Sequence, residues 1–202
     1  MRTKADNLVF FALILFAILI SSEVRADSTT SEEYQIKAAF LYNFVKFIDW
    51  PEGKIGEDSE SITIGIIGKD PFGEAFKPLK YKRIKGKYVV IKRFKGLKEL
   101  EENKEKKKSE SDKQVEDIKK CHLLFICSSE KQKLKEILNM VKDHHVLTVG
   151  DTKGFLEAGS IIEFIMVDRK VRFGINMAAA KEAELTIRSQ LLRLAEKIIK
   201  EK

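Results

Sequence analysis

The sequence has 202 residues, a formal net charge of +7, 44% hydrophobic residues and 34% charged residues. This length is enough for one domain with a buried core, and the composition excludes wholesale disorder. The basic residues are interleaved with acidic ones and form no one-sided basic helix, so the sequence predicts no nucleic-acid partner.

The first 26 residues have the three parts of a secretory signal peptide. Arg2 and Lys4 form a short basic head, Leu8–Ile20 is an unbroken apolar run, and Ala26 ends a small-residue exit. The apolar run would span about 20 Å as a helix, less than the roughly 30 Å of a bilayer core. We therefore predict cleavage and an exported protein of residues 27–202 that forms one domain. Retention of the run as a membrane anchor is the alternative.

The stretch from Tyr34 to Pro51 predicts a buried helix. Its apolar residues recur every three or four positions, as at Phe40, Phe44 and Phe47, which is typical of an amphipathic helix. Charged residues such as Lys37 interrupt the run and make it too short and too polar to cross a membrane. We expect the helix to pack on a sheet, with a surface helix that contacts a membrane or a partner as the alternative.

Apolar, β-branched runs further along the chain predict buried strands that alternate with helices. The runs are Ser61–Gly68, Lys87–Phe94, Cys121–Cys127 and residues 145–151. The highly charged stretch at about 101–117 is expected to be a mobile loop, with a solvated helix end as the alternative. The alternation is typical of an α/β fold with three layers and a mostly parallel sheet.

The C-terminal third predicts a hairpin followed by a long helix. Two apolar runs flank Asp168 and Arg169 and would add an antiparallel edge to the sheet. From about Asn176 onward, residues such as Ile187 and Leu191 share one helical face. Asn176 is the expected N-cap of this long C-terminal helix.

The two cysteines, Cys121 and Cys127, are predicted to be buried and free. Six positions apart in one strand, they would face the same side and lie about 20 Å from each other, too far for a disulfide. An intermolecular bridge, or a strand that ends early and curls back, is the alternative. His122 points to the opposite face from Cys121, so the pair predicts neither a metal site nor a catalytic dyad.

No motif in the sequence predicts catalysis, a cofactor or a metal. The glycines after the first strand do not match a phosphate-binding loop, and the sequence contains no nucleophile motif. The predicted fold does indicate where a ligand would bind, because open parallel sheets bind ligands beyond the carboxyl ends of their strands. The residues expected there to contact a ligand or a partner are Asp70, Phe72, Ser128, Ser129 and Asp151. A small-molecule sensor and a hydrolase that uses these loops are both compatible with that position.

From Tyr34 to Ala195 the sequence resembles the YfiR-like family of small exported bacterial proteins. The resemblance is carried by IGIIGKDPFG, LTVGDTKGFLEAGSIIEF and, most specifically, VRFGINMAAAKEAELTIRSQLLRLA. Within the last block, Arg172, Asn176 and Ser189 match the family's terminal signature and are carried over as binding positions. The sequence departs from the family at Ala158, where a double glycine is common before the strand.

The resemblance implies a periplasmic regulator without enzymatic activity. Similar proteins bind the periplasmic region of an inner-membrane signalling protein, a diguanylate cyclase that makes cyclic di-GMP, and hold it inactive. A histidine kinase is the other type of membrane partner that we consider. The resemblance also implies a homodimer.

Overall fold

The computed structural model describes residues 31–54, 60–104 and 108–200, so the predicted signal peptide, residues 1–26, lies outside the described residues. Its first elements are the N-terminal helix (residues 31–47), β1 (Ile48–Asp49), β2 (Ser61–Ile67), the 3₁₀ helix η1 (Lys77–Leu79), β3 (Arg83–Ile84), β4 (Lys87–Phe94), α2 (Leu97–Lys104), α3 (Lys108–Lys119) and β5 (Leu123–Ile126). The later elements are η2 (Ser128–Lys133), α4 (Leu134–Val141), η3 (Lys142–His144), β6 (Leu147–Gly150), β7 (Ile162–Val167), β8 (Lys170–Asn176), α5 (Met177–Glu182), β9 (Thr186–Ile187), α6 (Ser189–Leu192) and β10 (Lys197–Ile199).

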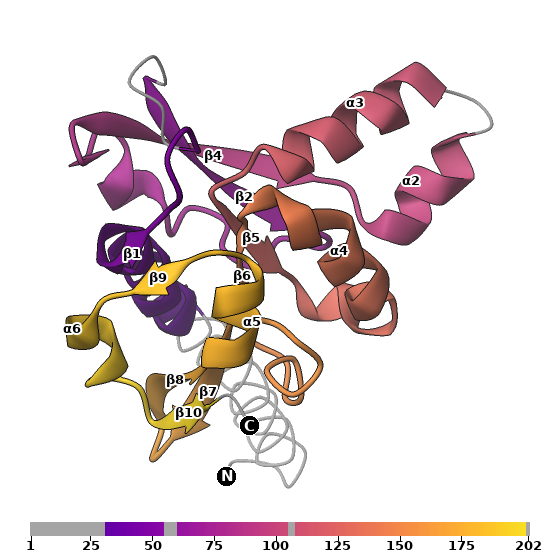
Figure 1. The fold of residues 1–202 in the computed structure, drawn as a ribbon. Helices are drawn as coiled ribbons and strands as arrows, with labels where there is room; N and C mark the ends of the chain where they lie inside the picture. Colours follow the sequence, from indigo (N-terminus) through magenta and orange to yellow (C-terminus); the bar gives the residue numbers. More distant parts are fainter. Residues whose placement is uncertain (1–30, 55–59, 105–107, 201–202) are drawn as a thin grey trace, which may run out of the picture.

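Eight strands of the described chain form one sheet, in the order β10-β8-β7-β6-β5-β2-β4-β3 (Figure 1). The neighbours from β4 through β2, β5 and β6 to β7 run parallel, whereas β3 and β8 pair antiparallel with β4 and β7. The prediction of a mostly parallel sheet is therefore confirmed. A separate two-stranded pair, β1 with β9, lies beside the main sheet.

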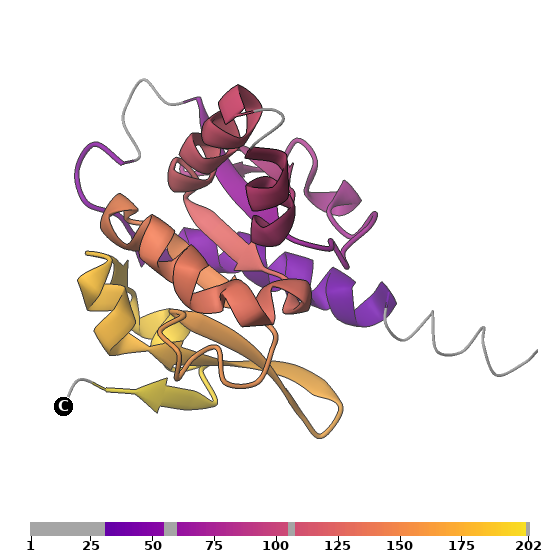
Figure 2. The same cartoon turned by 90° about the vertical axis from the view of Figure 1, so that its right-hand side faces the viewer.

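Side chains alternate between the two faces of the sheet and build two cores. On β5, Leu123 and Phe125 belong to one core, and Leu124 and Ile126 belong to the other. The N-terminal helix supplies buried residues to the first core, and α2, α3 and α4 supply buried residues to the second (Figure 2). The α/β class follows from this arrangement of helices on both sides of a sheet.

The N-terminal helix packs on the sheet, as its periodicity predicts. Phe44 is completely buried, and its ring lies 5.5 Å from the ring of Phe164 on β7 and 5.0 Å from that of Phe173 on β8. Phe40, one turn earlier in the helix, contacts the same two rings. No described helix is long and apolar enough to cross a bilayer.

The described part of the charged stretch at 101–117 is helical, which fits the alternative of a solvated helix and corrects the expectation of a mobile loop. α2 and α3 lie side by side at one end of the molecule (Figure 1), and residues 105–107 between them are not described. Leu97, Leu100 and Ile118 are buried in the second core, and the buried Ser111 donates to the carbonyl of Leu100 at 3.3 Å. These few buried positions anchor the two helices to the rest of the protein.

The expected long C-terminal helix is wrong. α5 ends at Glu182, and Glu184 follows in a left-handed conformation with φ of 57°, which a continuing helix cannot accommodate. The next residues alternate between buried Leu185 and Ile187 and exposed Thr186, a strand pattern that the helical spacing of more distant leucines obscured. The chain then forms β9, α6 and β10.

β7 and β8 pair antiparallel around a tight turn. Asp168 and Arg169 both have positive φ, 49° and 60°, as two-residue hairpin turns require. The pair is not the edge of the sheet, because β10 adds to the outer side of β8 in parallel. The expectation that this hairpin forms the edge is therefore wrong.

Candidate functional site at the carboxyl edge of the sheet

The carboxyl ends of β2, β5 and β6 meet at one edge of the sheet. Ile67 at the end of β2 lies beside Ile126 of β5, which in turn lies beside Gly150 of β6. The loops that follow these strands therefore gather at one edge. The predicted site residues that lie on these loops are Asp70, Phe72, Ser128, Ser129 and Asp151.

Asp151 is the centre of a buried polar cluster that reaches to the N-terminal helix. Its Oδ2 accepts from the phenol of Tyr34 and from Nζ of Lys37, both at 2.8 Å. Lys37 also contacts Glu33 at 2.6 Å, and the side chains of Lys37 and Asp151 are only 5% and 6% exposed. Burial, together with the Asp151 carboxylate, raises the pKa of Tyr34 well above its usual value.

Asp70 and Phe72 have structural contacts. Asp70 accepts from the backbone N–H of Phe72 at 2.8 Å and from Nε of Arg93 at 2.6 Å. The Phe72 ring is buried and lies 5.2 Å from Tyr34 and 4.8 Å from Phe125. Asp70 thus fixes the turn after β2, while Phe72 packs beneath the Tyr34 side of the cluster.

Ser129 joins the loops after β2 and β5, and both Ser128 and Ser129 are exposed residues. The Ser129 hydroxyl accepts from the N–H of Lys69 and donates to Oε1 of Glu130, both at 3.0 Å. The buried Glu130 carboxylate also accepts from the N–H of Leu97 at 2.9 Å. Gly68 has φ of +97°, and a Cβ there would lie 2.4 Å from the Ser129 hydroxyl, so this turn requires glycine.

The three residues carried over from the family signature lie on β8 and at the start of α6, and not on the loops after β2 and β5. Asn176 caps α5, because its side chain accepts from the N–H of Ala179 and donates to the carbonyl of Leu156, both at 3.0 Å. The N-cap prediction is thus confirmed, although the helix is short. Arg172 is exposed on β8, and Ser189 is exposed at the start of α6.

A hollow of about 680 Å³ lies beside the Lys37–Asp151 pair. It is lined on one side by those two residues and Glu33, and on the other by Glu163 and Met166 of β7. Glu163 is buried, and its Oε2 accepts from the N–H of Leu156 at 2.6 Å. The volume is in the range of small-molecule sites, and the acidic and basic side chains at its wall suit a polar or zwitterionic ligand.

Sequence reasoning missed Tyr34, Lys37 and Glu163 as site residues. The detectable signals were Lys37 on the apolar face of a helix and Glu163 inside an otherwise apolar strand. A charged residue in such a position is buried only when it has a partner. Tyr34 carried no signal of its own, since its partner Asp151 is 117 residues away in the sequence.

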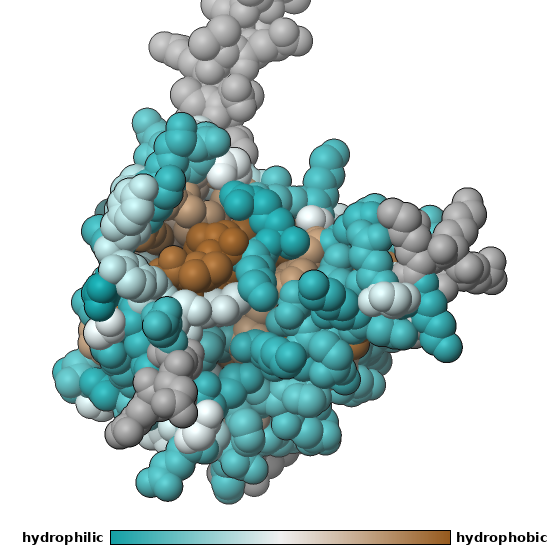
Figure 3. All heavy atoms as spheres, turned by 90° about the horizontal axis from the view of Figure 1, so that it is seen from above, coloured by the Kyte–Doolittle hydropathy of each residue, from teal (hydrophilic) through white to brown (hydrophobic). Residues whose placement is uncertain are grey.

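A second hollow, of about 310 Å³, lies between η1 and the outer strand β4. Apolar side chains of Phe76, Leu79, Val89 and Ile91 line it. Figure 3 shows this face of the molecule, on which an apolar depression is ringed by hydrophilic side chains. It contains none of the predicted site residues.

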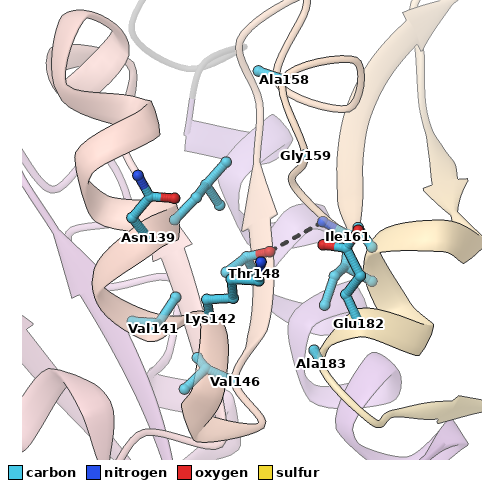
Figure 4. A pocket seen from close by; sticks show the side chains of 12 residues that line it. Asn139, Val141, Lys142, Val146, Thr148, Ala158, Gly159, Ile161, Glu182 and Ala183 are labelled. Carbon is cyan, nitrogen blue, oxygen red and sulfur yellow. Dashed lines mark hydrogen bonds between the residues drawn. The ribbon is translucent and has the colours of Figure 1, made fainter.

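A third hollow, of about 160 Å³, lies between α4 and α5 (Figure 4). Thr148 lies at its base, and its hydroxyl accepts from the N–H of Ile161 at 3.0 Å. Ser160 donates to the carbonyl of Thr148 at 3.3 Å. Because these polar groups satisfy one another and the space is small, this hollow offers little to a ligand.

Cys121 and Cys127 are both buried and free, as predicted. They belong to opposite cores, which corrects the expectation that they face the same side. Cys127 continues the alternation of β5 and shares a core with Leu123 and Phe125, whereas Cys121 lies before the strand begins at Leu123 and packs in the other core. Burial raises the pKa of the Cys121 thiol to about 12 and also raises that of Cys127, which keeps both thiols protonated.

His122 is buried beside Trp50, and its Nδ1 accepts from the N–H of Thr63 at 3.1 Å. Its Nε2 has no partner among the described residues. Burial lowers the pKa of His122 to about 4, so the ring is neutral at pH 7. Within the described ranges, no three His, Cys, Asp or Glu side chains are grouped as metal ligands.

Comparison with known proteins identifies one family. The model described as YfiR/HmsC-like matches residues 34–196. No curated protein sequence matches the chain.

Two solved structures show a distant likeness. One is a conserved domain protein from Vibrio cholerae O1 biovar El Tor, with 12% identity, a TM-score of 0.44 and coverage of 72% of this chain and 56% of that one. The other is the ABC domain in complex with L-Trp from Streptococcus pneumoniae, with 11% identity, a TM-score of 0.48 and coverage of 68% and 55%. This chain therefore spans little more than half the length of either structure.

Proposed function

We propose a function from one premise: the chain belongs to the YfiR/HmsC-like family. The family is known for periplasmic regulators. We infer that this protein is exported, that it binds an inner-membrane signalling protein of the diguanylate cyclase type, and that it holds this partner inactive. The family match over residues 34–196 is the observation that carries the proposal.

The contacts at the carboxyl edge support docking without a catalytic step. Asp151, Asp70 and Glu130 each accept hydrogen bonds from neighbouring elements of the protein itself. These hydrogen bonds hold the loops of this edge in fixed positions, which suits a preformed docking surface. The hydroxyl of Ser129 is likewise occupied on both sides.

The mechanism we propose is stoichiometric inhibition. The regulator binds one conformation of the partner's periplasmic region and thereby lowers the population of the active conformation. Shifting a two-state partner from almost fully active to almost fully inactive requires about a 10⁴-fold preference for the inactive state. A protein of this size can supply that preference through one standard interface.

The test uses the protein of residues 27–202 and membranes that contain the candidate cyclase. Cyclic di-GMP synthesis is measured as the regulator is added. We expect inhibition that saturates at one regulator per cyclase protomer, and a crosslinked complex of the same stoichiometry. Unchanged synthesis at saturating regulator, or recovery of the full-length unprocessed chain from the cytoplasm, would overturn the proposal.

A small-molecule sensor is the second candidate, and the hollow beside Lys37 and Asp151 favours it. A bound ligand would stabilise the folded protein according to its concentration relative to Kd. A thermal-shift screen of amino acids and small acids should then find a stabiliser whose effect is lost in Glu163→Gln. A screen in which no compound shifts the melting temperature would remove this candidate.

A further inference from the structure

β4 is an outer strand that β3 covers only at its beginning. β3 pairs Arg83 with Tyr88 and Ile84 with Lys87. β4 continues to Phe94 and pairs from Tyr88 to Phe94 with β2 on the inner side. The outer side of its second half therefore has no strand beside it in the described chain.

The backbone of this second half points hydrogen-bonding groups away from the sheet. Tyr88 donates its N–H at 3.1 Å to the carbonyl of Glu60, on the β2 side, whereas Val89 donates outward at 3.3 Å to the residue before β3. Since consecutive residues of a strand point their backbone groups to opposite sides, Ile91 and Arg93 also point outward. Neither has a backbone partner among the described residues on that side.

The apolar hollow of about 310 Å³ adjoins this open edge, because Val89, Ile91 and Arg93 of β4 line it. Val89 and Ile91, whose backbone faces outward, also contribute side chains to its floor, and Phe76 and Leu79 form the opposite wall. A strand added to β4 would therefore place alternate side chains in the hollow. This combination of an open edge and an adjoining apolar groove is the geometry of β-strand addition.

The charges around the hollow indicate which kind of segment fits. Lys77, Lys80 and Arg93 line it, against one acidic residue, Glu74. Lys77 and Arg93 have carboxylate partners, Glu74 and Asp70. No described carboxylate lies within ion-pair distance of Lys80, whose Nζ lies 5.2 Å from the centre of the Tyr81 ring. A second copy of this chain would bring another basic edge to the same place, so like charges disfavour self-pairing.

We propose that the β4 edge and its hollow bind an extended, acidic segment of a partner protein. The segment adds to β4 as a new strand through Ile91 and Arg93, places an apolar side chain between Leu79 and Val89, and places a carboxylate near Lys80. The proposal deepens the function above by naming a binding surface, and it rests on that function only for the identity of the partner.

The probe is a short fluorescein-labelled peptide that alternates valine with glutamate and threonine, and binding is followed by fluorescence anisotropy. We expect saturable binding that is lost when the glutamates are replaced by lysines or when alternate amides of the peptide are N-methylated. Lys80→Glu should weaken binding about two- to fivefold. Lys135→Glu, an equally exposed change on α4, is the matched control and should leave binding unchanged.

Amide hydrogen exchange tests the register. On peptide binding, the amides of Ile91 and Arg93 should become protected, while those of Val90 and Lys92, already directed to β2, should change little. Equal protection of all four, or no saturable binding, would overturn the proposal. Protection that rises with protein concentration alone would assign the edge to self-association and would overturn it as well.

The two proposals can fail separately. If the protein inhibits the cyclase but does not bind the peptide, only the proposal that the β4 edge is a binding surface is overturned. A protein that binds the peptide but leaves cyclic di-GMP synthesis unchanged overturns only the regulatory function.

Discussion

The two faces of the sheet are covered by layers of different chemistry. The N-terminal helix covers one face with aromatic rings, including Phe40 and Phe44, and buries the ion pair of Lys37 with Asp151. On the other face, α4 contributes aliphatic residues such as Ile137, and ion pairs such as that of Lys133 with Glu136 stay near the surface. The aromatic layer encloses this ion pair beside a hollow of about 680 Å³ that could hold a ligand.

This difference indicates where substitutions should be most costly. Aromatic rings contact two strands at once, and a buried charge depends on each of its partners. The aliphatic layer can repack around a lost methylene more easily, and its surface ion pairs contribute little. The predictions below test whether the aromatic layer is indeed the more demanding of the two.

The largest effect is expected for Phe44→Ala. The change removes ring contacts with both Phe164 and Phe173 from a completely buried position, and should reduce the free energy of unfolding by about 3–5 kcal/mol. Ile137→Ala is the matched change in the aliphatic layer, and we expect a smaller loss. Urea unfolding of both variants measures this, and an equal or reversed order would contradict the comparison.

Lys37→Met should cost about 3–5 kcal/mol, because it leaves the Asp151 carboxylate buried without its cation. Lys133→Met is the matched control, since Lys133 also contacts two carboxylates, Glu101 and Glu136, but is 30% exposed. We expect the control to lose less than about 1 kcal/mol. Adding Asp151→Asn to Lys37→Met should restore part of the lost free energy of unfolding. Similar costs for Lys37→Met and Lys133→Met would refute the contrast between the buried and the surface ion pairs.

Acid should destabilise the aromatic layer through His122. Its pKa is lowered by burial to about 4 from 6.5, so the unfolded chain takes up a proton below about pH 6.5 and the folded protein does so only near pH 4. The contribution of neutral His122 to the free energy of unfolding is therefore fully present above pH 6.5. It falls by about 3 kcal/mol as the pH drops to 4. Urea unfolding across this range should show the slope, and His122→Gln should remove most of it. His144→Gln, at a half-buried position, should keep it.

Local patterns in the sequence predicted those elements whose hydrophobic period matches the pattern of buried residues in the structure. The run Lys87–Phe94 is β4 with the same bounds, Phe44 lies on the buried face of its helix, and Asn176 caps a helix. In each case the residues that define the pattern are also those that make the contacts. Such elements can be recognised without knowledge of the rest of the chain.

The elements that were missed depend on few residues or on distant ones. α3 is held by Ile118 and Ser111 within a charged stretch, and β10 pairs with β8 only because the turn at Glu184 redirects the chain. The Tyr34–Asp151 contact joins residues 117 positions apart. The position of the candidate site at the strand ends could be predicted from topology, but the residues that meet there could not.

The smallest predicted effect concerns Asp49, which links β1 to β9 at the rim of the aromatic layer. Arg188 donates to both of its carboxylate oxygens, at 2.7 and 2.8 Å, and Lys85 donates at 3.0 Å. The Arg188 hydrogen bond is the main reason that the pKa of Asp49 is lowered to about 2 from 3.8. The pair therefore stabilises the fold above about pH 4, and this contribution is lost as the pH falls toward 2.

Because the Asp49 side chain is 40% exposed, Asp49→Asn should cost less than about 1 kcal/mol at pH 7. The difference from the unchanged protein should shrink in high salt and disappear near pH 2, and unfolding measured at both pH values tests this. His122 acts in the window above pH 4 and Asp49 in the window below it, so the two contributions can be separated in one titration. A cost for Asp49→Asn that persists at pH 2 would mean that the side chain stabilises the rim through packing, and that its charge is not what joins β1 to β9.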